Sequence, residues 1–301
     1  MRYEYLSQHP NIYQKCTGIS VKAFDDLLHE VVPSYLEAEG VRLQRPDRRR
    51  ALGAGHPFEL TVRDQVLLTL VWLRLYPIHE VLGYLFGVSD STVSRTIERV
   101  LPRLEEAGRD TMRLPDPGKK RRRQMSDLLQ AIPELTVVID SFEQRVQRPP
   151  NDNRHFSGKK KQNTLKSQVA VDGQSGRLVD TSASVAGPTS DLSLLKQSGL
   201  LERLPEECGA AGDLGYLGLD KLHPLAFLPR RKPRGKPRPA EDKPYNTAFS
   251  SFRVIVEQTI GRLRRFQSLS QMDRNHRRQQ GARVAAVAGL VNRQPCFDGA
   301  I

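Results

Sequence analysis

The chain has 301 residues, of which 38% are apolar and 27% charged, and its formal net charge is +13. This length allows two domains, or one large domain with a small appendage. The basic residues are clustered, which favours a polyanionic partner, with nucleic acid first, over a charge that serves solubility alone.

The cysteines and the apolar stretches exclude several protein classes. Cys16, Cys208 and Cys296 are far apart, match no zinc-site spacing and are odd in number, which argues against a disulfide framework. We therefore expect a reducing, intracellular compartment, and cytoplasmic, nucleoid-associated localisation. The N-terminal MRYEYLSQHP has no apolar signal core. The longest apolar stretch, Val66–Leu75, contains Arg74 and is too short to span a bilayer, so no membrane partner is expected.

The first predicted element is a helix over residues 18–40. Its apolar side chains recur at helical spacing: Phe24, Leu27, Leu28, Val31 and Val32. Residues 44–57 are basic and rich in Gly and Pro, which predicts a linker.

Residues 60–102, approximately, predict a helix-turn-helix. Thr61 can cap its first helix, with Asp64 completing an imperfect capping box. That helix should end near Tyr76, because Pro77 follows.

The second helix of the motif covers about Ile78–Phe86, and a Gly-Val turn follows it at 87–88. Ser89 or Ser91 then caps a third helix that continues to about Leu101. Short helices joined by a tight Gly-containing turn are typical of a helix-turn-helix. The alternative is an ordinary helical hairpin with a solvated face.

The third helix carries small polar residues at its start and basic residues beyond, which suits entry into the major groove. Arg95 could reach a base edge or a phosphate. The predicted DNA-binding residues of this helix are Ser91, Thr92, Ser94, Arg95 and Arg99.

A basic segment, PGKKRRRQ at 117–124, predicts a boundary between two domains. The run Lys119–Arg123 is expected to be a solvated linker that can also touch phosphates. We therefore expect a helical DNA-binding domain over 1–116, a linker over 117–134 and a catalytic domain over 135–301.

From Leu135 the period of the sequence changes from helix to strand. LTVVID is a continuous β-branched run that predicts a buried strand ending at Asp140. Strands at 165–171 and 177–186 follow, and the DGQSG between them predicts a hairpin turn that involves Asp172.

The remaining elements alternate. We expect a helix at about Asp191–Ser198, strands ending near Asp213 and at 225–229, and closing helices at Phe249–Phe266 and 279–292. The Pro-rich basic stretch 229–245 should contain neither strand nor helix. The order of elements predicts an α+β protein, in which an all-helical domain precedes an RNase H-like domain with a mixed sheet.

One carboxylate, Glu257, lies among arginines on the penultimate predicted helix. On ideal helix geometry Ser250, Arg253, Gly261 and Arg264 lie within about 40° of it, beside the apolar face. Gly261 costs a helix interior about 1 kcal/mol relative to Ala, so we expect another group to approach closely there. The simpler interpretation is an Arg253–Glu257 pair at i,i+4, which stabilises a helix by about 0.2–0.5 kcal/mol.

Asp140 and Asp213, near the ends of two strands, can converge with Glu257. Carboxylates at close range repel one another, and Mg²⁺, which prefers oxygen ligands, relieves the repulsion. Two such ions can stabilise the attacking and leaving oxygens of a phosphoryl displacement. A basic protein with such a cluster is typical of an enzyme that acts on nucleic-acid phosphodiesters.

Other acidic residues have simpler expected roles. Asp172 belongs to the turn, Asp180 should be exposed in its strand, and Asp191 most simply caps or opens a helix. Glu143, three residues after Asp140, is a candidate to support it.

Together these blocks resemble the DDE transposases of bacterial insertion sequences, insertion-sequence family five-like, over about residues 18–292. VIDSFEQRVQRP (138–149) is similar to the family's first-Asp block and GDLGYLG (212–218) to its second. HFSGKKKQNTLKSQ (155–168) resembles the basic block before the second strand, and RVIVEQTIGRLRRF (253–266) the glutamate block. The family often has Tyr at the position of Ser250 and Lys at that of Arg264.

The resemblance implies an RNase H-like catalytic fold, metal-dependent cleavage of DNA, and attack of a 3′-hydroxyl on target DNA. Asp140, Asp213 and Glu257 would be catalytic and would ligate two Mg²⁺, for which Mn²⁺ may substitute. The helix-turn-helix would recognise inverted-repeat ends of double-stranded DNA, and the synaptic complex would be a homo-oligomer. The resemblance assigns phosphate contacts to Arg253, Arg264, Lys159, Lys160, Lys161 and Lys166, although the four lysines could equally be surface charge.

Two other functions fit the same sequence. One is a former transposase that binds DNA as a regulator without cutting it, against which the presence of all three carboxylates argues. The other is a hydrolytic endonuclease that performs no strand transfer. Terminal inverted repeats in the flanks of the gene would distinguish a transposase from such an enzyme.

Overall fold

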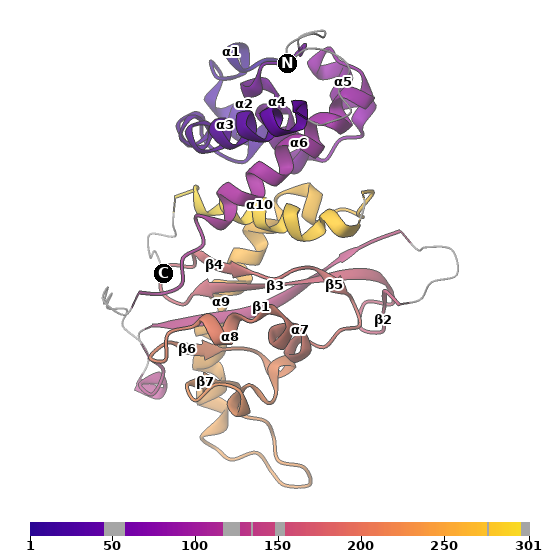
Figure 1. The fold of residues 1–301 in the computed structure, drawn as a ribbon. Helices are drawn as coiled ribbons and strands as arrows, with labels where there is room; N and C mark the ends of the chain where they lie inside the picture. Colours follow the sequence, from indigo (N-terminus) through magenta and orange to yellow (C-terminus); the bar gives the residue numbers. More distant parts are fainter. Residues whose placement is uncertain (45–57, 117–126, 134, 148–153, 276, 296–301) are drawn as a thin grey trace.

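The computed structural model describes residues 1–44, 58–116, 127–133, 135–147, 154–275 and 277–295. A group of helices formed by the N-terminal third lies above a mixed sheet, with the C-terminal helix between them (Figure 1). The predicted α+β class is confirmed. The predicted linker at 44–57, beyond Gln44, and the basic run Lys119–Arg123 lie outside the described residues.

The N-terminal region contains six α-helices among its described residues. They are α1 (Tyr3–Leu6), α2 (Pro10–Thr17), α3 (Val21–Leu43), α4 (Val62–Leu75), α5 (His79–Phe86) and α6 (Asp90–Arg109). The helix predicted over 18–40 is α3. Helices α1 and α2 were not predicted, although α2 has the usual signals of Pro10 at its start and a left-handed Gly18 (φ 84°) after its end. No described helix is long and apolar enough to cross a membrane.

The predicted helix-turn-helix forms as α4, α5 and α6. Thr61 caps α4 by accepting from the Asp64 amide at 3.1 Å, and Ser89 caps α6 by accepting from the Thr92 amide at 3.1 Å. The turn comes so close to α5 that a Cβ on Gly83 would lie 2.6 Å from the Val88 carbonyl oxygen. Glycine is therefore required at 83 for the tight turn.

Helix α6 does not end near Leu101 as predicted. It continues through Pro102 to Arg109, although a proline in a helix interior removes one backbone hydrogen bond. Its last turns pack on α10 (Gln280–Asn292), and the two helices cross at Gly108 and Gly289, where neither position has room for a Cβ. The gain from this packing outweighs the loss at the proline, so α6 joins the helical region to the sheet region.

The sheet has the strand order β2-β3-β1-β6-β7, and β4 and β5 also pair with β3. The strands are β1 (Thr136–Arg145), β2 (Phe156–Ser157), β3 (Gln162–Asp172), β4 (Leu178–Thr181), β5 (Val185–Ala186), β6 (Gly209–Ala211) and β7 (Ala226–Phe227). Strand β1 is antiparallel to β3 and parallel to β6, so the sheet is mixed as predicted. The predicted DGQSG turn is confirmed: Asp172 Oδ1 accepts from the Ser175 amide at 2.7 Å.

Strand β1 was predicted to end at Asp140, and this was wrong. It continues for five residues to Arg145 because β3 is long enough to pair with all of it. Its alternate side chains enter two cores: Val138 and Phe142 pack toward α9 (Asp242–Arg264), and Val137 and Ile139 toward α7 (Asp191–Ser198) and α8 (Leu200–Arg203).

The other segments lie close to their predicted positions, with two differences. Helix α9 begins at Asp242, so the end of the 229–245 stretch is helical, and the strand predicted at 177–186 is divided into β4 and β5. Short 3-10 helices complete the described chain: η1 (Asp127–Leu129), η2 (Leu214–Tyr216), η3 (Leu219–Lys221), η4 (Gln267–Leu269) and η5 (Arg277–Gln279).

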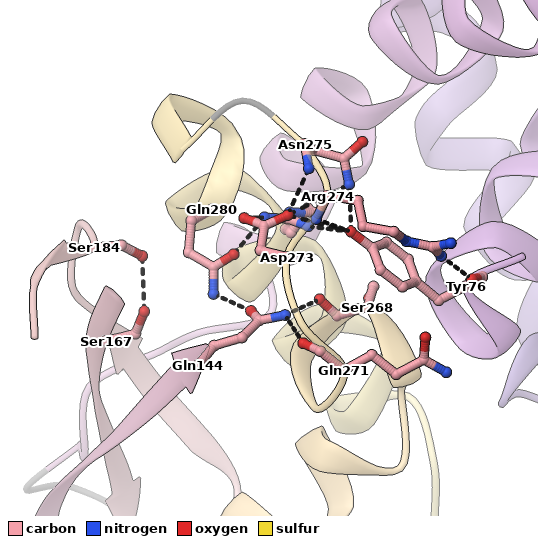
Figure 2. A network of polar contacts seen from close by, with 11 residues as sticks. Tyr76, Gln144, Ser167, Ser184, Ser268, Gln271, Asp273, Arg274, Asn275 and Gln280 are labelled. Carbon is pink, nitrogen blue, oxygen red and sulfur yellow. Dashed lines mark hydrogen bonds and ion pairs between the residues drawn. The ribbon is translucent and has the colours of Figure 1, made fainter. Parts of the chain in front are cut away.

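A buried polar network joins the helical region to the sheet (Figure 2). At its centre, Arg283 of α10 forms an ion pair with Asp273, and their side chains are 0% and 1% exposed. Tyr76, at the end of α4, donates to Asp273 Oδ1 at 3.2 Å. Gln280 connects Arg283 to Gln144 of β1. The Asp273 amide also donates to the Arg145 carbonyl of β1 at 2.7 Å, so one network fixes α4, α10 and the far half of β1.

Replacing one member of the buried ion pair should destabilise the whole chain. We expect Arg283→Met to lower the free energy of unfolding by about 3–5 kcal/mol, because it leaves the Asp273 carboxylate buried without its cation. Chemical denaturation measures the loss. The double variant Arg283→Met/Asp273→Leu should lose less than the sum of the single losses, and a loss below about 1 kcal/mol for Arg283→Met would contradict the assignment.

Candidate active site

The candidate site lies at a gap in the sheet, where β1 continues and β6 has ended. Strand β6 pairs with β1 only from Thr136 to Val138, and Arg145 is bonded again through Asp273. Between them, residues 139–144 have no strand partner on that edge within the described part of the chain. A polar pocket of about 430 Å³ opens here.

Asp140 and Asp213 occupy equivalent places on the two parallel strands. The last paired residues are Val138 and Ala211, and each aspartate lies two positions beyond its own. Neighbouring strands are about 4.8 Å apart. Asp213 is half-buried and opens η2, where its Oδ1 accepts from the Gly215 amide at 2.9 Å.

The surroundings of Asp140 raise its pKa. Burial raises its pKa from 3.8 to about 6, and the charges of Asp213 and Asp191 add to the rise. The Ser141 amide, 2.7 Å from Oδ1, and Arg253, 3.3 Å from Oδ2, act in the opposite direction. A cation near Asp140 would therefore favour its ionised form.

Glu257 approaches the same pocket from α9. Its side chain is exposed and lines the pocket together with Ile260 and Arg264. The i,i+4 interpretation is not what the structure contains, because Arg253 pairs with Asp140 across the core. The space beside Gly261 is open: a Cβ there would meet nothing within 4 Å.

Asp191 also lines the pocket, although the sequence predicted only that it caps or opens a helix. It is the first residue of α7, but Ser190 supplies the cap by accepting from the Ser193 amide at 3.2 Å. The Asp191 carboxylate instead accepts from Ser141 Oγ at 2.6 Å and from Lys166 Nζ at 3.0 Å. The available signal was Ser190, since a serine that already caps the helix leaves the next carboxylate available for other contacts.

The predicted phosphate-binding residues are in different environments. Lys159, Lys160 and Arg264 line the pocket and are exposed, and Lys161 is exposed beside a neighbouring pocket. Lys166, in contrast, is 9% exposed and pairs with Asp191, and Arg253 is 11% exposed and pairs with Asp140. These last two cations balance carboxylates of the site.

The predicted recognition residues of α6 also differ in exposure. Ser91 and Arg95 are exposed at the start of the helix. Thr92 and Ser94 are half-buried, and the Thr92 hydroxyl lies 2.9 Å from Ser89 Oγ. Arg99 is half-buried, and its guanidinium lies over the ring of Phe58 at 4.9 Å.

Asp180 and Glu143 are held by polar partners. Asp180 was expected to be exposed, and this was wrong, because its side chain is only 12% exposed and binds Arg203 through two hydrogen bonds of 3.1 and 3.0 Å. Glu143 lines the pocket and accepts from Thr164 Oγ1 at 2.6 Å, so it lies beside the site as expected.

The donor chemistry of the site fits a hard divalent cation, because every acidic donor is a carboxylate oxygen. Asp191 and Asp213 are close to each other: a Cβ on Gly215 would lie 2.5 Å from Asp191 Oδ2 and 2.9 Å from Asp213 Oδ1. Within the described residues, however, no three acidic, His or Cys side chains form a group that could hold a metal. Arg253 is the described cation that pairs with Asp140, at 3.3 Å.

Comparisons with known proteins identify the family to which the chain belongs. Residues 139–292 match the family model of the DDE superfamily endonuclease, and residues 58–110 match the helix-turn-helix of DDE superfamily endonuclease. A probable transposase for insertion sequence element IS702 from Microchaete diplosiphon is 29% identical over 281 residues, which cover 93% of each chain. No solved structure matches. The predicted family and the predicted helix-turn-helix are thereby confirmed.

The buried charge of Asp140 should destabilise the metal-free protein at neutral pH. Since its pKa of about 6 exceeds the unfolded value of 3.8, folding favours the protonated form, and stability should fall as pH rises from about 4 to 6 and stay reduced above it. Asp140→Asn should therefore raise the free energy of unfolding at pH 7, by on the order of 2–3 kcal/mol.

The measurement is chemical denaturation in a chelating buffer at pH 4.5 and pH 7. The gain from Asp140→Asn should be larger at pH 7 than at pH 4.5. A variant that is less stable than the parent chain at pH 7 would show that the Arg253 ion pair outweighs the cost of burial.

Proposed function

Because the chain belongs to the DDE superfamily of endonucleases, we propose that it is a DNA transposase. It cuts double-stranded DNA at the inverted-repeat ends of an insertion sequence, and the freed 3′-hydroxyl attacks target DNA. The observation that carries this proposal is that Asp140 and Asp213 each lie two positions beyond the last pair of two parallel strands, and that Glu257 of α9 lines the same pocket as Asp140. The relative of similar length, a probable transposase, supports it.

Asp140, Asp213 and Glu257 would hold two divalent cations, Mg²⁺ by preference and Mn²⁺ as a substitute. When bound, such ions stabilise charge on the attacking and leaving oxygens of phosphoryl transfer. The raised pKa of Asp140 supports this assignment, since a group that is costly to ionise alone gains most from a bound cation. Until then Arg253, whose guanidinium lies 3.3 Å from Asp140 Oδ2, would offset the charge of this carboxylate.

The basic residues of the pocket divide into two groups by exposure. Lys159, Lys160 and Arg264 are exposed and would hold phosphates of the scissile strand. Lys166 is buried and holds Asp191, which in turn holds Ser141 next to Asp140. Asp191 and Lys166 would thus be positioning residues that fix β1 at the site.

The helix-turn-helix would recognise the ends. Arg95, at the exposed start of α6, is the residue placed to reach a base edge or phosphate in the major groove, with Ser91 beside it. Two DNA ends must be held together before strand transfer, so the working form would be a homo-oligomer, and it would act on DNA of the nucleoid.

The catalytic assignment is tested with purified protein and labelled DNA that carries the flanks of its own gene, in Mg²⁺ or Mn²⁺. We expect specific nicks at the ends with the parent chain, and a loss of at least about 100-fold in rate with Asp213→Asn and Glu257→Gln, because each removes a metal-binding charge. Glu257 is exposed, so Glu257→Gln should fold normally.

Glu241→Gln is the matched control, since it removes an exposed glutamate from the start of the same helix. If Glu257→Gln nicks the ends as fast as the parent chain does, Glu257 is not part of the catalytic site. Binding to the ends without cutting by the parent chain would favour a retired, DNA-binding regulator, and cutting without joining would favour a hydrolytic endonuclease.

Substitutions of Arg95 and Arg99 should have different effects, one on DNA binding and the other on thermal stability. Arg95→Ala should weaken binding to the specific ends by about 1–3 kcal/mol and leave thermal stability unchanged, because its side chain is exposed. Arg99→Ala should lower thermal stability instead, since Arg99 packs on Phe58. Gel-shift titration and thermal unfolding of both variants check this, and equal effects of the two on binding would contradict it.

A further inference from the structure

A second basic pocket lies beside the last turn of α9. Arg264 lines the candidate active site, and the next residue, Arg265, lines another pocket of about 510 Å³. Lys15 of α2, Arg74 of α4 and Arg262 also line it, with the amides of Asn11 and Gln14. The pocket therefore combines side chains from the N-terminal helices with the helix that carries Glu257.

Described carboxylates do not balance the charges of Lys15, Arg74 and Arg265 in this second pocket. Four cations line it, and no carboxylate is among its lining residues in the described part of the chain. Lys15, Arg74 and Arg265 form no ion pair with any described residue. Burial, and then the charge of Arg265, lower the pKa of Arg74. Like charges gathered at this range are unfavourable unless an anion joins them.

Internal packing explains only part of this cluster. Arg262 is used by the fold, because it donates to the carbonyls of Val291 at 3.0 Å and Pro295 at 3.3 Å. Arg74 lies over the ring of Phe266 at 5.1 Å. Lys15 and Arg265 are exposed, and the attraction of cations to helix C-termini is worth only about 0.3–1 kcal/mol at such positions. These two residues are the part that needs another explanation.

Gly261 provides an independent observation. It lies in the interior of α9, one turn before Arg265, where glycine costs about 1 kcal/mol relative to alanine. No described group fills the space, since a Cβ would meet nothing within 4 Å. Glycine at an exposed helix position with no packing reason permits the close approach of an external backbone. The bare surface of Gly261 lies between Glu257 and Arg265 on the same helix.

We propose that the second pocket holds a phosphodiester group of the DNA whose scissile bond lies at the active site, so that the DNA backbone crosses α9 at Gly261. This inference rests on the proposed function. One strand would then contact Arg264 at the active site and Arg265, Arg74 and Lys15 beyond it. The contact is independent of base sequence and links the N-terminal helices to the catalytic helix through the substrate.

The test measures binding of a 30-bp duplex of arbitrary sequence to the full chain in a chelating buffer, over a range of salt concentrations. Arg74→Gln/Arg265→Gln should lower the slope of log affinity against log salt by about 1–2, because each phosphate contact contributes about 0.9. Lys196→Gln/Lys221→Gln is the matched control, since it removes two exposed charges away from the pocket and should change the slope little.

A second variant tests the path over α9 without a change of charge. Gly261→Gln should weaken DNA binding several-fold, because its side chain occupies the path, and should raise the free energy of unfolding, because glutamine is the better helix former. A merely structural role of Gly261 would not produce these opposite effects. Arg265→Gln alone changes an exposed residue and keeps the test valid if the double variant folds poorly.

The outcomes separate the two proposals. A salt slope of the double variant equal to that of the parent chain would overturn the pocket, as would a parent chain that does not bind DNA. If the double variant has a reduced slope and the parent chain binds DNA but never cuts it, the pocket is supported and the catalytic proposal fails.

Discussion

The candidate site depends on one constraint of the sheet: β6 is three residues long and β1 is ten. Within the described part of the chain, the shorter strand leaves residues 139–144 of β1 unpaired on that edge, so backbone groups there must face a pocket or solvent. Asp213 follows β6 at the position that matches Asp140, because parallel strands bring equivalent residues to the same level. The site is thus a consequence of strand length, and the helices complete it.

The polar network around Arg283 fixes β1 on the far side of this gap. It holds Gln144 and Arg145 of β1 beyond the gap, and it does so from α10 and the end of α4. The same α10 crosses α6 at a pair of glycines. Helix α6, which is proposed to read DNA, and strand β1, which carries Asp140 of the proposed catalytic site, are therefore fixed to one another through α10. The position of one constrains the position of the other.

Acidic and basic side chains both gather around this open edge of β1. A chain with a net charge of +13 keeps four carboxylates, Asp140, Asp191, Asp213 and Glu257, around one open edge. Arg253 and Lys166 balance two of them from within. The exposed Lys159, Lys160 and Arg264, which also line the pocket, are the residues proposed to contact phosphates. The arrangement accounts for why a single glutamate stands among the arginines of α9.

Much of this could be predicted from the sequence, because caps, turns and periodicity are local. Ser89, Thr61 and the Asp172 turn behave as predicted. The errors came from tertiary contacts that no local pattern contains. Pairing with β3 extends β1 past Asp140, and packing on α10 carries α6 past Pro102.

The carboxylates show the same division between local and tertiary information. Motif order identified three acidic residues, and their roles as metal ligands remain predictions. Asp191 was missed and Asp180 was taken as exposed because each is paired with a basic residue at least 23 positions away in sequence, Lys166 for one and Arg203 for the other. Such long-range ion pairs have no local signal.

The most direct test of the account is the binding of Mn²⁺ to the protein without DNA, measured by electron paramagnetic resonance in the parent chain, Asp140→Asn and Glu241→Gln. We predict that the parent chain and Glu241→Gln bind Mn²⁺ equally, and that Asp140→Asn loses about tenfold or more in affinity. Undiminished binding by Asp140→Asn would show that the open edge of β1 is not the metal site.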